Sequence, residues 1–366
     1  MSVKAAKEII SKLDAHIPDV KSPGVIFSND PDIKTFPITK EAFRHIEHVP
    51  SNRRLAFVDG GNLEILGAPN FSVQFNRIYG CVWKNNTRQP LNIPRVEFFS
   101  AIYSTFLDGG ISYETIITPC KHEHSLLLPD AKDLSFNSND RTVMVGSQMA
   151  DTSRIASIAR NFAEWKFGAL VCEHLENDDV LVMDGSLQTQ FTNEDKYFAR
   201  IEKTAKERGV VLASLAKTSR LFTTTGLSLV GAVNQFADQE HIGGEWYLPV
   251  FESVQSHRTY TIIVKLKEIS DWVFRLDFQR DQFRSLDEKS INEILSLLCS
   301  NASDPVFPGY TFGSIVADQY SRVSENEIDY YRPILMSQLS EIRKQDKFRY
   351  HIRAGDAHEK LNEVVG

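Results

Sequence analysis

Two short segments that each end in Asp-Gly place the strongest constraint on the fold of this chain. They are LAFVDGGN, which contains Asp59, and VLVMDGSL, which contains Asp184. Each begins with an apolar, β-branched run, which is typical of a buried strand. Gly60 and Gly185 would let the backbone turn just after each acid. Two such strands in one sheet would bring both carboxylates to one edge, whereas the alternative interpretation is an ordinary β-turn at each pair.

Paired carboxylates at strand ends suit hard divalent cations such as Mg²⁺ or Mn²⁺. Such a pair also suits metal-assisted phosphodiester hydrolysis, because two ions clamp the attacking and leaving oxygens. Three more polar residues stand in apolar surroundings: Glu164 in NFAEWKFGAL, Asp318 in SIVADQY, and Lys217 at the end of VVLASLAK. Helix-borne Glu164 and Asp318 would complete the acids of a two-metal nuclease, with Lys217 on the scissile phosphate. The alternative is that both acids lie on solvated helix faces.

The composition is that of a folded protein with a substantial core, since 42% of its 366 residues are hydrophobic and 24% are charged. A net charge of −7 excludes a simple DNA-coating protein but allows an enzyme with a local basic groove. Four cysteines without a CxxC pair predict free thiols. The amphipathic N-terminal segment is no secretory signal, and no apolar run is long enough for a membrane span. We therefore expect a reduced, cytoplasmic protein without membrane contact.

Signatures of several other enzyme classes are missing from the sequence. The chain has no GxxxxGK[ST] motif of a P-loop ATPase and no GxSxG motif of a nucleophile-elbow hydrolase. Its Gly-Gly pairs are isolated and too weak to indicate a dinucleotide site. His122 and His124 could share one face of a strand, but no third ligand with zinc-site spacing follows.

The hydrophobic periodicity predicts one mixed α/β domain over residues 51–330, with helical additions at residues 1–50 and 331–366. Strands and helices alternate around the second Asp-Gly segment, as in a parallel strand–helix–strand unit. Strands are predicted at 55–59, 71–83, 180–184, 210–217 and within 245–280, and helices at 3–17, 96–107, 154–175, 194–209, 287–299, from about 314, and at 332–345.

An ordered series of motifs makes the chain similar to the NurA family of DNA-repair nucleases. The series begins with FVDGGN at Asp59 and continues with a helix that carries Glu164. MDGSL at Asp184 resembles the second Asp-Gly-Ser strand of the family. LASLAKTSRL, with Lys217 and Ser219, resembles its Lys-Thr-Ser segment.

The series continues toward the C-terminus. VFRLDF, with Arg275, resembles a basic strand near the sheet edge of the family, and FPGYTFGSIVADQY, with Asp318, resembles its final turn and acid-bearing helix. Together the motifs cover residues 55–325. The first motif departs from the family, which often has Ser or Thr at the position that Gly61 occupies here.

The resemblance implies an RNase H-like core, which is a mixed sheet flanked by helices with the acids at one sheet edge. It implies DNA cleavage that depends on two Mn²⁺ or Mg²⁺ ions, exonucleolytic from 5′ ends and endonucleolytic on single strands. The activity would serve end resection in double-strand break repair. The resemblance also implies a homodimer whose central channel admits DNA, docked to a HerA-type hexameric ATPase translocase.

The resemblance assigns roles to individual residues. Lys217 would contact phosphate and act in catalysis, Ser219 would lie in the same substrate-binding segment, and Arg275 would contact DNA. The metal ligands would be Asp59, Glu164, Asp184 and Asp318.

Two other functions remain open at this point. One is a catalytically weak DNA-binding or scaffold subunit of a translocase complex, acting in defence against foreign DNA. The other is an RNase H-like enzyme that cuts RNA or hybrids. Comparing single-stranded DNA, duplex DNA and hybrid in one Mn²⁺ assay separates the three hypotheses.

Overall fold

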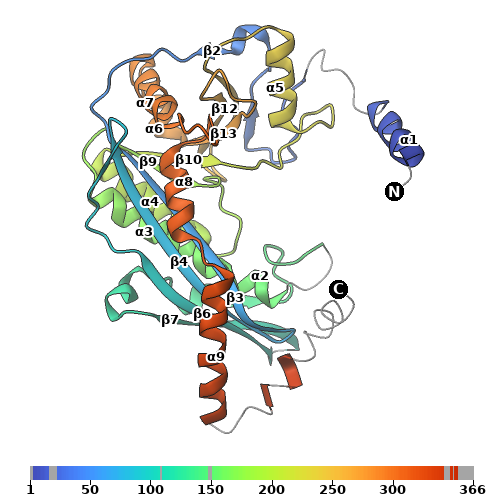
Figure 1. Cartoon of the computed structure of the whole chain (residues 1–366), viewed down its shortest axis with the longest axis vertical. Coiled ribbons are helices and arrows are strands. Elements are labelled where there is room, and N and C mark those ends of the chain that lie inside the picture. Colours follow the sequence, from blue (N-terminus) through green and yellow to red (C-terminus); the bar gives the residue numbers. More distant parts are fainter. Residues whose placement is uncertain are drawn as a thin grey trace. The chain divides into compact units, whose positions relative to one another are not determined.

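The computed structural model of the chain describes residues 3–15, 23–107, 109–146, 151–341, 347–348 and 350–352 (Figure 1). The chain divides into two compact units that alternate along the sequence. Unit 1 comprises Met1–Asn52, Gly185–Leu187 and Ala213–Phe312, and unit 2 comprises Arg53–Asp184, Gln188–Leu212 and Gly313–Gly366. The predicted division into residues 1–50, 51–330 and 331–366 stays a prediction.

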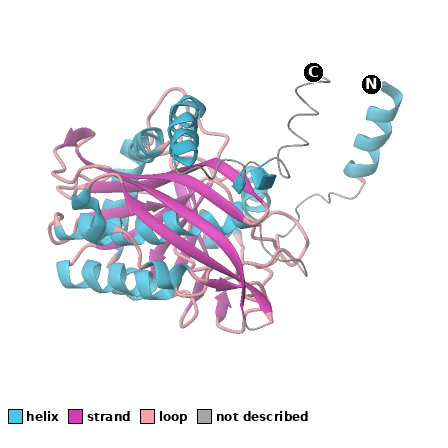
Figure 2. Cartoon of the chain, turned by 90° about the horizontal axis from the view of Figure 1, so that it is seen from below, coloured by secondary structure: helices cyan, strands magenta, loops and turns pink. Residues whose placement is uncertain are grey.

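Unit 2 is built on a mixed β-sheet, which confirms the predicted α/β class (Figure 2). Its strand order is β9-β3-β4-β6-β7-β8. Strands β3 and β9 run parallel, and the other neighbours run antiparallel, including the short β5 beside β4. The strands are β3 (Leu55–Ala68), β4 (Phe71–Lys84), β5 (Thr87–Gln89), β6 (Val96–Leu107), β7 (Gly110–Pro119), β8 (Phe136–Asn137) and β9 (Val180–Asp184).

Helices α3 and α8 lie on opposite faces of β3. An added Cβ at Gly80 of β4 would lie 2.9 Å from the Phe167 ring of α3, and one at Gly313 of α8 would overlap the Phe57 ring. Gly80 pairs with Val58, so the α3 face is that of Val58, and Phe57 points to the other. The helices that unit 2 contributes are α2 (Thr152–Ala156), α3 (Ile158–Glu173), α4 (Glu194–Arg208), α8 (Phe312–Ser321) and α9 (Glu325–Glu341).

Unit 1 contains an antiparallel sheet in the order β1-β11-β12-β13-β10, and β2 pairs with β11. Its core packs α5 against β11, with the Phe43 and Trp246 rings in edge contact at 4.9 Å. The elements are α1 (Val3–Asp14), β1 (Ile33–Thr35), β2 (Arg44–His45), β10 (Val211–Ala216, whose first two residues belong to unit 2), α5 (Leu229–Gln239), β11 (Trp246–Ser253), β12 (Thr259–Lys265), β13 (Phe274–Gln279), α6 (Arg280–Ser285) and α7 (Glu288–Asn301).

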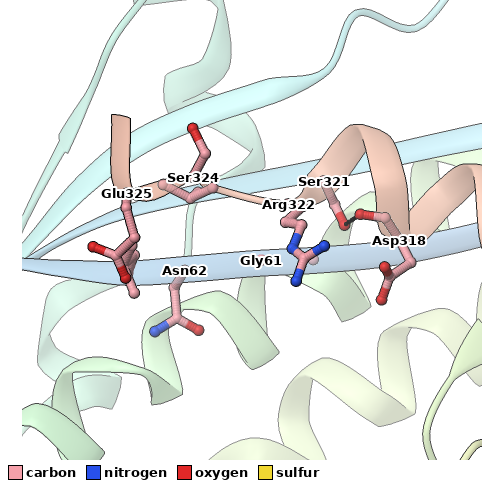
Figure 3. A pocket seen from close by; sticks show the side chains of 10 residues that line it. Gly61, Asn62, Asp318, Ser321, Arg322, Ser324 and Glu325 are labelled. Carbon is pink, nitrogen blue, oxygen red and sulfur yellow. Dashed lines mark hydrogen bonds between the residues drawn. The ribbon is translucent and has the colours of Figure 1, made fainter. Parts of the chain in front are cut away.

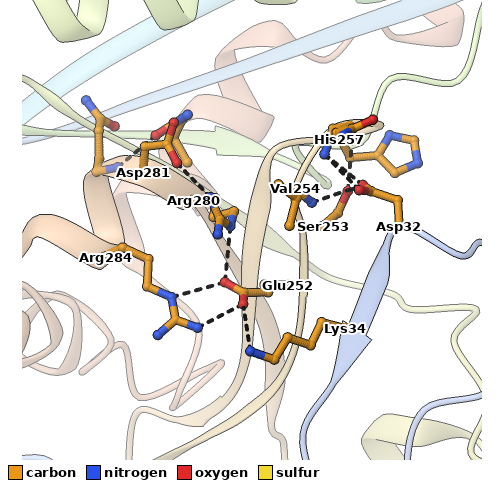
Figure 4. Close-up of polar contacts among 12 residues, drawn as sticks. Asp32, Lys34, Glu252, Ser253, Val254, His257, Arg280, Asp281 and Arg284 are labelled. Carbon is orange, nitrogen blue, oxygen red and sulfur yellow. Dashed lines mark hydrogen bonds and ion pairs between the residues drawn. The ribbon is translucent and has the colours of Figure 1, made fainter.

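A buried carboxylate on β11 organises one edge of unit 1 (Figure 4). Glu252, whose side chain is 3% exposed, accepts hydrogen bonds from Arg280 and Arg284 and pairs with Lys34 at 3.7 Å. Burial by itself raises the pKa of Glu252. The two guanidinium groups lower it by more than burial raises it, so the pKa lies below its ordinary value. This network ties α6 and β1 to β11, so residues 1–50, predicted as a helical extension, also supply strands to the sheet.

Several sequence-based predictions of secondary structure need correction. Residues 96–107 form strand β6 instead of a helix, because buried and less buried positions alternate along its first half. The helix predicted at 154–175 is broken at Ser157 into α2 and α3. The last helix begins at Glu325 rather than near residue 332. Residues 342–345 of this predicted helix and residues 16–17 of the predicted first helix lie outside the described residues. His122 and His124 lie in a 3₁₀ helix, not on a strand.

The remaining elements and the cysteines agree with the sequence. The predicted strands at 71–83 and 180–184 and the helices at 194–209 and 287–299 are confirmed within a few residues. All four cysteines are free, and burial raises the pKa of Cys172 and Cys299 to about 12. Among the described helices, none is both long and apolar enough to span a bilayer.

Candidate active site

Asp59 and Asp184 are brought together by the parallel pair β3 and β9. The last residues that pair are Val58 and Met183, so the two acids that follow them lie side by side where the pairing ends. Strand β9 stops at Asp184, whereas β3 continues to Ala68 with β4 as its partner. The prediction that β3 ends at Asp59 is therefore wrong, and Asp59, which is 5% exposed, sits within a long strand.

Gly60 allows the Glu164 side chain to approach the β3 backbone closely and does not form a turn. It is an extended residue of β3, and an added Cβ there would overlap Oε1 of Glu164 on α3 and lie 2.7 Å from the Ile78 side chain. The Glu164 carboxylate therefore rests directly on the β3 backbone. Arg160, one helical turn earlier, donates a hydrogen bond to the Gly60 carbonyl at 3.0 Å and forms an ion pair with Glu164. These two side chains fix α3 against the strand beside Asp59.

Burial and the charges of Arg160, Asp59 and Asp184 set the electrostatics of Glu164. Burial raises the pKa of Glu164 to about 8, Arg160 opposes that rise, and the charges of Asp59 and Asp184 add to it. Burial and like charges both favour the neutral form of a carboxyl group, whereas the Arg160 guanidinium favours its ionised form. Three carboxyl groups from β3, α3 and β9 thus share one small region of unit 2.

Asp318 approaches β3 from the face opposite to α3. Side chains alternate along a strand, so Phe57, Asp59 and Gly61 share the face that α8 covers. An added Cβ at Gly61 would lie 2.5 Å from the Ser321 carbonyl oxygen, so α8 contacts β3 closely near its C-terminal end. Asp318 lies one turn earlier on this helix, over the same face as Asp59.

A pocket of about 610 Å³ opens beside these acids (Figure 3). It runs between β3 and the turn that joins α8 to α9. Arg322 is the basic residue among those that line it, and its guanidinium lies over β3 in Figure 3, between Asn62 and Asp318. The lining residues are Gly60, Gly61, Asn62, Leu63, Asp318, Ser321, Arg322, Val323, Ser324 and Glu325.

The four acids are of the ligand type that divalent cations prefer, but their side chains are not arranged around a cation position. Carboxylate oxygens are the ligands that Mg²⁺ and Mn²⁺ prefer, and a bound cation would offset the burial and the aspartate charges that together raise the pKa of Glu164. Within the described residues, however, no group of three or more His, Cys, Asp or Glu side chains is arranged to hold a metal ion. Glu164 is paired with Arg160 instead, so a cation would have to replace that guanidinium.

The predicted substrate-binding residues belong to unit 1, whereas all four acids belong to unit 2. Lys217 follows β10, and the Ser219 hydroxyl accepts a hydrogen bond from the Leu221 amide at 3.4 Å. Their contacts with phosphate stay predictions. Arg275 is 5% exposed and donates two hydrogen bonds of 2.8 Å to the buried Asp277. The prediction that Arg275 contacts DNA is untested, and this internal pairing argues against it.

Sequence reasoning missed an aromatic pair beside Asp59. Tyr79 is the cross-strand partner of Asp59 on β4, and its ring stacks on that of Tyr320 of α8 with centroids 5.1 Å apart. The guanidinium of Arg88 lies 5.9 Å and 5.5 Å from the two ring centroids. Nothing in the local sequence joins these residues, which come from three elements. By contrast, the ion pair between Arg160 and Glu164 could have been predicted from the sequence, because side chains four residues apart on a helix are neighbours.

Comparisons with known proteins bear on the identity of this site. Residues 53–323 match the family model of the NurA domain. No curated protein matches the chain. Among solved structures, an Argonaute of Aquifex aeolicus aligns over 74% of this chain at 9% identity, with a TM-score of 0.26. The structure of Aa-Ago with externally bound siRNA aligns over 69% of this chain at 10% identity, with a TM-score of 0.21. The chain spans only 28% and 24% of those two proteins.

Proposed function

Because the NurA domain model covers most of its length, the chain belongs to the NurA family, a family of nucleases, and we propose that it hydrolyses DNA with the help of divalent metal ions. The observation that carries this proposal is the convergence of Asp59, Glu164 and Asp184 from three elements. Burial is the largest cause that raises the pKa of Glu164 to about 8, and the charges of Asp59 and Asp184 add to the rise. Strongly shifted carboxyl groups of this kind cluster at functional sites.

The four acids would hold Mn²⁺ or Mg²⁺. When bound, two such ions would supply an activated water and stabilise charge on the scissile phosphate. The residues of the chain prepare the site around them. Gly60 leaves the space in which the Glu164 carboxylate rests on β3, and Arg160 forms an ion pair with Glu164 and a hydrogen bond with the Gly60 carbonyl. Asp318 faces the same region from α8.

Tyr79, Tyr320 and Arg88 support a nucleic acid as the substrate. Aromatic rings combined with arginine are typical of surfaces on which unpaired bases stack. Tyr320 is 45% exposed, so its ring can meet a base next to the acids. Single-stranded DNA is therefore the substrate that this side of unit 2 suits best.

The finer properties follow from family membership and are part of the proposal. The enzyme would remove nucleotides from 5′ ends and cut within single strands, as a cytoplasmic nuclease in end resection. It would act as a homodimer with a HerA-type hexameric ATPase translocase. Lys217 and Ser219 would contact phosphate.

The proposal is tested by substituting the paired aspartates. Asp59→Asn and Asp184→Asn each remove a charged metal ligand, and we expect Mn²⁺-dependent cleavage of single-stranded DNA to fall by more than roughly 100-fold. The exposed Asp329→Asn on α9 is the matched control and should cleave at the wild-type rate. Cleavage of single-stranded DNA, duplex DNA and hybrid is followed on gels with Mn²⁺ and Mg²⁺. Wild-type activity in either active-site variant would show that the acids were wrongly assigned.

The Arg160–Glu164 ion pair favours one other function. A guanidinium at the acids could keep metal out, which suits a catalytically weak DNA-binding or scaffold subunit of a translocase complex that acts in defence. This alternative predicts DNA and partner binding without cleavage by any divalent ion. The same gels decide it when they are run with and without a co-purified ATPase.

A further inference from the structure

We propose that the pocket between β3 and the α8–α9 turn binds a backbone phosphate of single-stranded DNA next to the bond that is cut, and that Arg322 is the residue that contacts this phosphate. The inference rests on the proposed function, since it concerns the same strand of DNA. It adds a binding site and a contact residue that the acids alone do not provide.

The location of the pocket is the first argument. Its walls begin at Gly60 and Gly61, directly after Asp59, and include Asp318 on the opposite side. A DNA strand that places one phosphate at the acids would therefore place a neighbouring nucleotide in the pocket. The volume of about 610 Å³ lies within the range of roughly 300–1,000 Å³ that small-ligand sites occupy.

Charge is the second argument. The chain carries a net charge of −7, and the acids add negative charge at the point where a DNA backbone would have to approach. Phosphates are bound most strongly by charge-assisted hydrogen bonds from guanidinium groups. Arg322 supplies the positive charge of a pocket that Asp318 and Glu325 also line. The hydroxyl groups of Ser321 and Ser324 already donate hydrogen bonds to the Asp318 carbonyl and to Glu327, so the guanidinium is the group on which phosphate binding depends.

The backbone that carries Arg322 is firmly held, which is the third argument. The guanidinium of the buried Arg77 donates a hydrogen bond of 2.7 Å to the Arg322 carbonyl. Arg77 is itself paired with Glu97 at 2.8 Å and with Glu327 at the start of α9. Glu327 also accepts a hydrogen bond from the Ser324 amide at 3.0 Å. The backbone at Arg322 is therefore already ordered, so only the side chain loses freedom when it binds a phosphate.

The shape of β3 is the fourth argument. An added Cβ at Gly61 would collide with the Ser321 carbonyl oxygen at 2.5 Å, so a larger residue there would push α8 and its turn away from the strand. Gly61 thus keeps the pocket narrow beside the acids and keeps Arg322 over the strand.

The test measures binding separately from cleavage. Asp184→Asn serves as the background that does not cut, and Arg322→Ala is added to it. We expect Arg322→Ala to weaken binding of a labelled oligothymidine roughly fivefold to tenfold, measured by fluorescence anisotropy. The slope of log affinity against log salt should fall by about 0.7, the value for one lost phosphate contact on a single strand. Arg322→Lys should retain most of the slope, and Arg322→Glu should bind more weakly than Arg322→Ala.

Arg200→Ala is the matched control, because Arg200 is exposed on α4 and does not line the pocket. It should leave affinity and slope unchanged. If Arg322→Ala keeps the affinity and salt slope of its background while the wild-type protein cleaves DNA, the phosphate site is wrong and the nuclease proposal stands. If the wild-type protein neither binds nor cleaves any DNA, both proposals fail.

Discussion

Gly60 and Gly61, the two residues after Asp59, let different helices approach β3 from opposite faces. Glu164 of α3 rests on Gly60, and the Ser321 carbonyl of α8 lies against Gly61. Neighbouring residues of a strand point to opposite faces, so two consecutive glycines open both faces at one point. This close contact accounts for Gly61, which stands at a position where the NurA family often has Ser or Thr. A hydroxyl-bearing side chain at position 61 would collide with α8.

Gly60→Ala tests this arrangement. The added methyl group would overlap the Glu164 carboxylate and crowd Ile78, so we expect the carboxylate to be displaced by about an ångström. Such a displacement at a reacting centre costs roughly 100-fold in rate, and overpacking costs about 1–3 kcal/mol of unfolding free energy. Cleavage assays and thermal unfolding measure the two effects.

Gly110→Ala at the start of β7 is the control, because the nearest atom to an added Cβ lies 3.8 Å away. It should behave like the wild-type protein in both measurements. A Gly60→Ala variant with wild-type cleavage would show that Glu164 need not lie where the structure has it.

At the scale of elements, the turn between α8 and α9 depends on one buried guanidinium. Arg77 of β4 connects Glu97 of β6, the Arg322 carbonyl and Glu327 of α9. The hydrogen bond from Arg77 is the main cause that lowers the pKa of Glu327 to about 2. A group whose pKa is lower in the folded state stabilises the fold above its unfolded pKa and loses this effect as the pH falls.

This gives a prediction for pH. Wild-type protein should be more stable than Glu327→Gln at neutral pH, and the difference should shrink as the pH falls from about 4.5 to about 2. Urea unfolding at a series of pH values measures it. The exposed Asp329→Asn, two residues further along α9, should show no such pH dependence. An equal stability gap at pH 7 and pH 2 would mean that the ion pair adds nothing.

The sequence predicted the elements that carry the acids better than the contacts between them. The apolar lead-ins of β3 and β9, the helix around Glu164 and the helix around Asp318 were all visible as periodicity. The strand at residues 96–107 could not be recognised from periodicity, because its aromatic and apolar residues fit either a helix or a half-buried strand. The Arg77 network and the Tyr79–Tyr320 pair join residues more than 200 positions apart, which no local pattern can indicate.

At the scale of the whole molecule, each unit has its own polar network. In unit 1 the buried Glu252 is surrounded by Lys34, Arg280 and Arg284. Nearby, hydrogen bonds from Ser256, Ser253 and Gln255 outweigh burial and hold the pKa of Asp32 well below its usual range. These groups belong to unit 1, whereas the four acids belong to unit 2, so they support the fold rather than the chemistry.

Glu252→Ala should therefore reduce stability without touching the acids of unit 2. Removal of one partner of a fully buried pair costs about 3–5 kcal/mol, and the partly exposed arginines reduce this to about 2 kcal/mol. Urea unfolding measures the loss, with the exposed Glu268→Ala of unit 1 as control. Equal stability of the two variants would show that the guanidinium groups are solvated well enough without Glu252.

The alternation of the two units along the chain restricts how the protein can be divided. The chain passes between them after Asn52, Asp184, Leu187, Leu212 and Phe312. Every N-terminal or C-terminal fragment that removes one unit also removes strands or helices of the other, so neither unit can be produced as one continuous piece. The second of these crossings follows Asp184 immediately. Asp184, one of the paired acids, is therefore also the last residue of unit 2 before the chain enters unit 1, so a cut at this boundary would fall directly beside the candidate site.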